Sequence, residues 1–290
     1  MRLHKAVLII LYGGGLMVVA AVLTKGLHYY TLPLSQRPHS PLHPLLKPSG
    51  LWGHGLGIVG SSMMLLLFLY SMRKRCLCGL SFGKLRSWLN IHIFLGIMGP
   101  ILVTLHTSFK FGGLVSVSYF SMVAVMLSGF VGRYLYVQIP RALSGDELTA
   151  KEMSEHNERM TRVLVEQYHI KPEQLRRLQG QAVTKMRRGG GGLAVLAAIL
   201  KDDLTRPFRV RAFKRRLRRE QLDLPQEKVA HLVWVAKQQS LLMRKMALLS
   251  AIKPLFHYWH VAHKPFAYVM IIIMFLHVTV TILFGYRWIF

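Results

Sequence analysis

The sequence predicts an all-α integral membrane protein with five transmembrane helices, an inward N-terminus and a helical cytoplasmic insert between the fourth and fifth helices. Hydrophobic residues make up 52% of the 290 residues, which is typical of a membrane protein with one sizeable extramembrane segment. All 12 acidic residues fall between Asp146 and Glu227. The apolar parts on either side therefore lack the carboxylates that a proton- or sodium-coupled transporter normally carries within the membrane.

Five apolar runs are long enough to cross a bilayer. In chain order they are Ala6–Leu23, Leu51–Tyr70, Trp88–Phe109, Leu114–Val137 and Pro265–Tyr286. We therefore divide the chain into residues 1–137 with the first four helices, residues 138–250 as the basic insert, and residues 251–290 with the fifth helix and an outer C-terminus. The segment Thr24–Gly50 is rich in Pro and His and is expected to be an irregular outer loop.

The orientation follows from a dense basic loop, Met72–Cys78, between the second and third runs. Such loops mark the cytoplasmic side of a membrane, so that the N-terminus and the insert are expected inside. The pair Cys76 and Cys78 then lies in a reducing compartment, and we expect structural thiols there rather than a metal site. We expect the protein in a bacterial inner (cytoplasmic) membrane.

The insert contains a strongly basic stretch, Arg206–Arg219, with eight Lys or Arg in 14 residues. It suits either a solvated or lipid-facing basic surface or a docking site for an acidic partner. Nucleic acid is disfavoured because the stretch is tethered to a membrane and has few interleaved aromatic residues. The glycine run Gly189–Gly192 lacks the Gly-Lys-Ser/Thr ending of a phosphate loop and is interpreted as a hinge.

Two of the apolar runs each carry a pair of histidines 14 residues apart: His92 and His106 in the third, His263 and His277 in the fifth. On an α-helix this spacing puts both members of a pair on one face, about 21 Å apart along the axis. Because both helices are predicted to run outward, His92 and His263 fall at the cytoplasmic level and His106 and His277 nearer the outside.

This arrangement suits two haem b groups better than zinc. Zinc requires four ligands in one place, whereas two histidines at each level would supply both axial ligands of a haem iron, a coordination suited to electron transfer. The second ring nitrogen of each histidine would then need a backbone carbonyl or a hydroxyl as acceptor. Structural histidines or another metal are the alternatives. His263 is the least secure ligand because Pro265 follows it and predicts a helix start or kink; His260 is its alternative.

Further residues are expected near these cofactors. Gly96 and Gly99 would let a porphyrin lie against the third helix, and the glycine-rich second helix is expected to be approached closely by a helix or a flat ring. His54 near its end could ligate iron, bind a propionate or line a quinone pocket, or be an interfacial histidine. Candidate propionate partners are Arg75, Arg86 and Arg133 on the inside and Lys110 on the outside.

The pattern of His92, His106, His263 and His277, with the neighbouring glycines, resembles the ferric reductase-like transmembrane domain of NADPH oxidases and bacterial relatives. The resemblance covers Leu51–Val137 and His260–Tyr286. It implies two stacked b haems and electron transfer across the membrane, usually outward. The chain departs from the family in having five spans where six are common, a long basic insert, and no flavin- or NADPH-binding domain. Reductant would therefore come from a partner protein or quinol.

The sequence thus favours a di-haem b-type cytochrome that exchanges electrons with a cytoplasmic acidic redox protein, an outer cytochrome, or both. One alternative is a quinol- or quinone-reactive cytochrome b subunit of a larger respiratory complex, with His54 near the quinone. The other is a membrane scaffold whose basic domain recruits a partner and whose histidines are only structural.

Overall fold

A computed structural model of the protein describes residues 2–75, 79, 82–139, 150–167, 192–220 and 226–285. Every regular element in these ranges is a helix, and five helices are long and apolar enough to cross a membrane. This agrees with the predicted all-helical class and with five helices able to span a membrane. Cys76, Cys78 and most of the glycine run Gly189–Gly192 lie outside the described residues.

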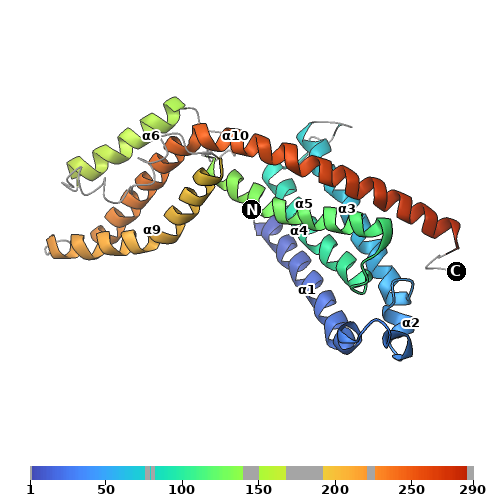
Figure 1. Cartoon of the computed structure of the whole chain (residues 1–290). Helices are drawn as coiled ribbons and strands as arrows, with labels where there is room; N and C mark the ends of the chain where they lie inside the picture. The colour runs from blue at the N-terminus through green and yellow to red at the C-terminus, as the bar shows by residue number, and fades with distance from the viewer. Residues whose placement is uncertain are drawn as a thin grey trace. The chain divides into compact units, whose positions relative to one another are not determined.

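The long apolar helices are α1 (Arg2–Thr31), α3 (Leu51–Lys74), α4 (Leu85–His106), α5 (Gly113–Gln138) and α10 (Gln226–Leu283), shown in Figure 1. The remaining described elements are the 3-10 turn η1 (Arg37–His39), α2 (His43–Leu46), α6 (Ala150–Arg162), the π-helical turn η3 (Val163–Gln167) and α9 (Gly192–Glu220). Thr24–Gly50, predicted to be an irregular loop, is therefore partly helical: it contains the end of α1, η1 and α2.

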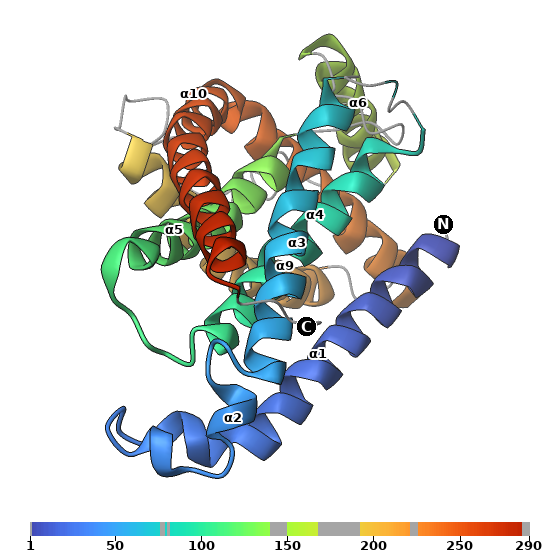
Figure 2. The same cartoon turned by 90° about the vertical axis from the view of Figure 1, so that its right-hand side faces the viewer.

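The chain forms two compact units. The first, residues 1–131 and 260–290, holds α1 to α4, most of α5 and the end of α10; the second is residues 132–259. In the first unit, α3 and α4 lie side by side in both views (Figures 1 and 2). A Cβ atom on Gly60 would lie only 3.2 Å from the carbonyl oxygen of Gly99. The glycines of α3 thus allow the close backbone approach that small residues give membrane helices.

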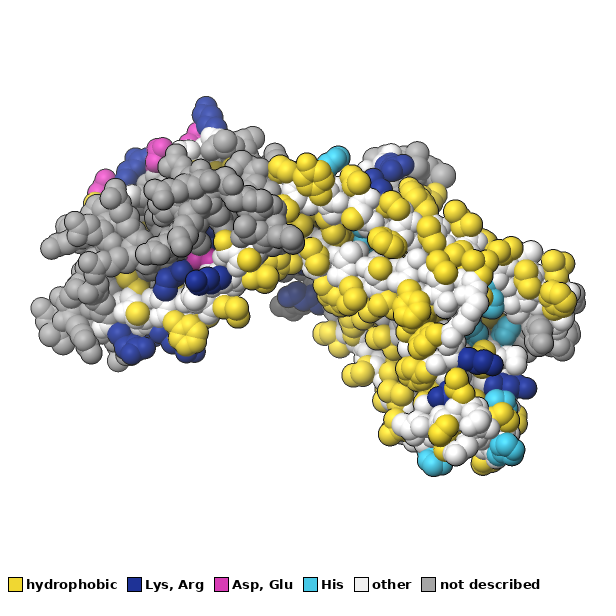
Figure 3. All heavy atoms as spheres, in the orientation of Figure 1, with side chains coloured by type: hydrophobic (Ala, Val, Ile, Leu, Met, Phe, Trp, Pro, Cys, Tyr) yellow, Lys and Arg dark blue, Asp and Glu magenta, His cyan; other side chains and the backbone are white. Residues whose placement is uncertain are grey.

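Two apolar clusters hold the first unit together. One joins α1, α2, α3 and α4 through buried side chains that include Tyr29, Leu46 and Phe94. The other joins α3, α5 and α10 through Met64, Met122 and Met270. Much of the remaining surface of the spans is apolar, as the yellow side chains of Figure 3 show, which suits a lipid environment.

The expectation that the fifth span begins near Pro265 is wrong. Helix α10 is continuous from Gln226 to Leu283, and both Pro254 and Pro265 lie within it. Membrane helices tolerate an internal proline because neighbouring groups satisfy the freed backbone carbonyl. His263 therefore belongs to a continuous helix and keeps its helical register with His277.

The second unit combines an apolar core with a buried ionic network. Leu164, Phe213 and Leu232 bring η3, α9 and α10 together. Nearby, the Arg244 guanidinium of α10 is hydrogen bonded to Asp202 at 2.9 Å and to Asp203 at 2.5 Å. Burial alone raises the pKa of Asp203, but its hydrogen bonds from Arg244 and Tyr134 hold that pKa below its ordinary value.

Candidate functional site

Helices α4 and α10 each carry two of the predicted histidines, and each of these lies near one on the other helix. His263 of α10 lies close enough to His92 of α4 for the two rings to interact electrostatically. His106 of α4 interacts in the same way with His277 of α10. We call these pairs the His92 layer and the His106 layer. Both contacts can hold only if α4 and α10 run in the same direction, as the sequence predicts for these spans.

Each ring of the His92 layer is held at its Nδ1 atom by a neighbouring helix. Nδ1 of His92 lies 3.2 Å from the carbonyl oxygen of Leu67 in α3, and Nδ1 of His263 lies 2.6 Å from Oγ of Ser128 in α5. The ring of Tyr70 lies beside that of His92, with their centroids 5.1 Å apart. Helices α3 and α5 therefore orient the two rings that α4 and α10 carry.

In the His106 layer, α3 holds the ring of His106. Its Nδ1 atom lies 2.8 Å from the carbonyl oxygen of Gly53. A Cβ atom on Gly57, one helical turn further along α3, would lie 2.6 Å from the same nitrogen. The ring thus occupies the space that a side chain at position 57 would need.

These contacts decide which ring nitrogen carries the proton. A carbonyl oxygen can only accept a hydrogen bond, so His92 and His106 must donate from Nδ1. The hydroxyl of Ser128 donates to the carbonyl of Val125 at 2.9 Å, so it accepts from Nδ1 of His263. In a neutral ring of this tautomer the lone pair is on Nε2, the atom through which such a histidine binds a metal.

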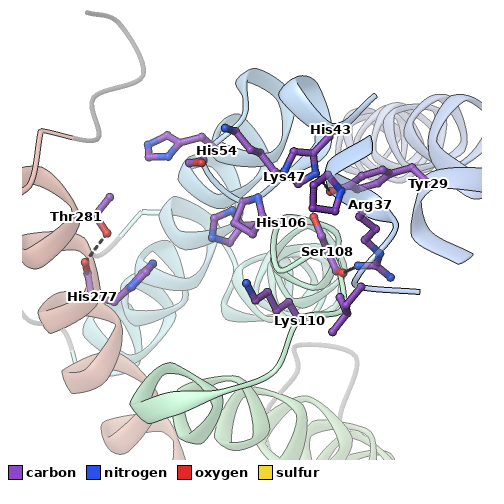
Figure 4. A pocket seen from close by; sticks show the side chains of 14 residues that line it. Tyr29, Arg37, His43, Lys47, His54, His106, Ser108, Lys110, His277 and Thr281 are labelled. Carbon is purple, nitrogen blue, oxygen red and sulfur yellow. Dashed lines mark hydrogen bonds between the residues drawn. The ribbon is translucent and has the colours of Figure 1, made fainter. Parts of the chain in front are cut away.

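The His106 layer opens into a cavity of about 520 Å³. Figure 4 shows His277 extending from α10 toward the space in front of His106, with His54 of α3 on another side. This volume lies within the range of about 300–1,000 Å³ that is usual for cofactor and ligand pockets. The structure therefore brings His54, His106 and His277 to one cavity.

The wall of this cavity is basic. Lys110, predicted to contact a propionate outside, lines it together with Arg37 and Lys47, and its described lining contains no Asp or Glu. Sequence reasoning missed Arg37 and Lys47 because both belong to the segment expected to be an irregular loop. The cationic wall and the absent carboxylates suit a ligand that brings negative charge.

Arg37 is buried and holds the outer segment together. Its guanidinium donates to the carbonyls of Leu32 at 3.0 Å and Tyr30 at 2.8 Å, and also to the carbonyl of Ser108. It also lies over the ring of Tyr29, 5.6 Å from the ring centroid. Arg37 therefore joins the end of α1 to the turn after α4, and so shapes the cavity.

Gly96 and Gly99 face α3. A Cβ atom on Gly99 would lie 3.0 Å from Sδ of Met64, and one on Gly96 would lie 3.8 Å from Leu67. Both glycines were expected to let a porphyrin lie against this helix, and the neighbours that a side chain there would meet belong to α3. The glycines bring α4 close to α3, which supplies the acceptors for both histidines of α4.

Methionines separate the two layers. Met64, Met122 and Met270 form one buried cluster. Met270 lies seven residues from both His263 and His277, which places it about 10 Å from each along the α10 axis. The space midway between the layers is therefore apolar and packed.

The other predicted residues are more widely spread. Arg75 and Arg86 are exposed near the ends of α3 and α4. Arg133 belongs to the second unit, where it lies over the ring of Tyr136 at 5.5 Å. His260 interacts electrostatically with His263, but the Ser128 hydrogen bond and the contact with His92 described above belong to His263.

Within the part of the chain that the structure describes, no three or more His, Cys, Asp or Glu side chains gather as a multidentate metal site would require. No protein-family model, curated protein or solved structure matches the chain. The functional argument therefore depends on the geometry of the histidines and their surroundings.

Proposed function

We propose that the chain is a di-haem b-type membrane cytochrome that passes electrons across the membrane to or from partner redox proteins. The observation that carries the proposal is that His92 lies near His263, and that His106 and His277 line one cavity, at two levels of the same two helices. Three of these rings present Nε2 because an oxygen atom holds Nδ1. This is how axial histidine ligands are oriented in metal sites generally.

The residues fit a haem at each layer. His92 and His263 would hold one haem, and His106 and His277 the other, with Lys47 and Lys110 able to neutralise propionates at the second. Haem iron with two axial histidines supplies one-electron redox chemistry without a vacant position for oxygen. The chain's own contribution is to hold the four rings and to keep the intervening methionine cluster free of water.

The direction of the helices and the partners belong to the same proposal. The basic residues after α3 and in α9 favour an inward N-terminus and a cytoplasmic second unit. A cytoplasmic redox protein with an acidic surface would suit the charge of that unit. The outer cavity would then face the opposite side of a bacterial inner membrane, where an outer cytochrome could exchange electrons with the His106 layer.

The purified full-length chain tests the proposal directly. We expect a b-type signal in the reduced-minus-oxidised absorption spectrum and about two haems per chain by pyridine haemochrome assay. The variants H92A and H106A should each lose about one haem, whereas H156A, at an exposed position of α6, should retain both. Absence of a b-type signal, or full haem content in both ligand variants, would refute the proposal.

The cavity beside the His106 layer favours a second candidate function, reaction with a quinone. It holds His54 and Lys110 next to His106 and His277, and these polar groups could bind a quinone carbonyl. A reduced quinol analogue should then reduce the isolated wild-type protein without any partner, and H54A should slow this reduction while keeping both haems. No reduction by quinol would rule out this candidate and leave the di-haem proposal intact.

A further inference from the structure

Helix α9 has one face that packs within the second unit and another that is exposed. The packed face carries Ile199 and Phe213, which belong to the apolar clusters, and Asp202 and Arg206, which are buried. Asp202 is paired with Arg244 and Arg209. Among the described side chains of α9, those that pack within the unit lie on this face, and exposed side chains lie on the opposite one.

Large apolar side chains stand on the exposed face at intervals of one helical turn. Leu200 is 50% exposed, Leu204 is 72% exposed and Phe208 is 67% exposed. A spacing of four residues lines these three side chains up along the helix. Scattered exposed hydrophobic residues are ordinary, but an aligned row on one helix indicates a binding surface.

Basic side chains flank this row on the same face. Lys201, Arg211 and Arg215 are exposed, and helical spacing places each of them within about 60° of the Leu204 direction. The guanidinium of Arg211 lies over the ring of Phe208, 5.9 Å from its centroid. Figure 3 shows yellow and dark-blue side chains interleaved over α9.

No carboxylate lies on this face among the described residues. Asp202 is buried, and Asp203 is hydrogen bonded to Arg244 and Tyr134. Asp202 and Asp203 are thus paired inside the unit, and the charged side chains described on the exposed face are all cationic. A face that mixes apolar and basic side chains suits an anionic membrane surface. The apolar side chains can enter the boundary of the acyl chains, while the long stems of Lys and Arg let their charges reach the headgroups.

We propose that α9 binds the surface of a bilayer that contains anionic lipids. Charge complementarity favours anionic headgroups, since each nearby Lys or Arg is attracted to them. The unit is also joined to spans at both ends, because α5 precedes it and α10 continues from it, so a bilayer is always present at high effective concentration. An acidic protein would match the charges of Arg211 and Arg215 but not the aligned Leu204 and Phe208.

Spin labels on the full-length protein in nanodiscs can test this. Cys76 and Cys78 are first replaced by serine, and single cysteines are then introduced by L204C, F208C and, on the exposed face of α6, H156C. Nanodiscs contain phosphatidylcholine, either alone or with about one third phosphatidylglycerol. Collisions with oxygen, which concentrates in the membrane, are compared with collisions with a water-soluble nickel complex.

With phosphatidylglycerol, we expect the oxygen-to-nickel collision ratio at positions 204 and 208 to be several-fold higher than at position 156. The double variant R211E/R215E should bring the ratio at position 204 down to the value at position 156, whereas the matched change K151E/R159E on α6 should leave it unchanged. Labels at 204 and 208 that collide freely with nickel in both kinds of nanodisc, or that are protected from both collision partners, would overturn the proposal. The first result would mean an aqueous face and the second a face covered by protein.

Discussion

Adding one methyl group at Gly57 should displace His106 and disturb only one of the two histidine layers. A Cβ atom at this position would lie 2.6 Å from Nδ1 of His106, whereas ordinary van der Waals contact begins near 3.4 Å. The ring must therefore move by the difference, 3.4 − 2.6 = 0.8 Å. That displacement exceeds the roughly 0.5 Å within which a functional constellation must be held, and it pulls Nδ1 from the carbonyl of Gly53.

The expected cost is that of overpacking a well-filled contact, about 1–3 kcal/mol. We therefore expect G57A to have a lower thermal stability than the wild type. If haem is bound as proposed, the haem at the His106 layer should be lost or change its absorption, while the haem at the His92 layer should be retained unchanged. Haem content, low-temperature absorption spectra and a thermal melt of the purified protein measure these effects separately.

The matched control is G129A in α5, because a Cβ atom at Gly129 would have no neighbour within 4 Å. It makes the same chemical change in a membrane helix and should leave both stability and spectra close to those of the wild type. Wild-type stability in G57A would contradict the packing of α3 against His106. A normal spectrum combined with a clear loss of stability would instead contradict the assignment of His106 as a ligand.

Three further predictions follow from other contacts. The variant S128A removes the acceptor of the Nδ1 hydrogen bond of His263. Its affinity for haem at the His92 layer, measured by haem titration of the apoprotein, should fall about 10–100-fold. The control variant S116A, near the start of α5, should keep full affinity. The variant R244M removes one of the ion-pair partners of the buried Asp202 and should destabilise the second unit by about 3 kcal/mol. A thermal melt no different from that of R159M, at an exposed site on α6, would contradict the buried network. The pKa of Asp203 is below its ordinary value in the folded chain. The ionised Asp203 side chain therefore stabilises the fold at a pH above the unfolded pKa of about 3.9. This stabilisation is lost as the pH falls through the lower pKa of the folded state. The variant D203N should therefore flatten the acid limb of a stability-versus-pH curve relative to the wild type, and an unchanged limb would show that Asp203 contributes nothing there.

Several features of the candidate site could be predicted because they depend on spacing along one helix. Residues 14 apart return to the same face of an α-helix, so the pairing of His92 with His106 along α4 needs no tertiary information. The direction of α4 relative to α10 followed from counting apolar runs. The proximity of His92 to His263 and of His106 to His277 is compatible with this direction.

Other features depend on contacts between segments far apart in the sequence. The acceptors of His92 and His106 are backbone carbonyls of Leu67 and Gly53, and a carbonyl is present at every residue, so no pattern could single out these two. The burial of Arg37 could not be predicted for the same reason. Its three acceptors are also backbone carbonyls, on the end of α1 and on the turn after α4.

The sequence by itself determined the helical class, the five apolar spans, the removal of acidic residues from them and the matched histidine spacing. These properties depend on composition and on the helical period, which are local. Only the tertiary structure decided that α10 runs unbroken through Pro265, that α3 lies against Gly99, and that Leu67 and Gly53 supply the acceptors of His92 and His106. Each of these depends on which neighbour fills the space beside a residue, and packing between distant segments settles that.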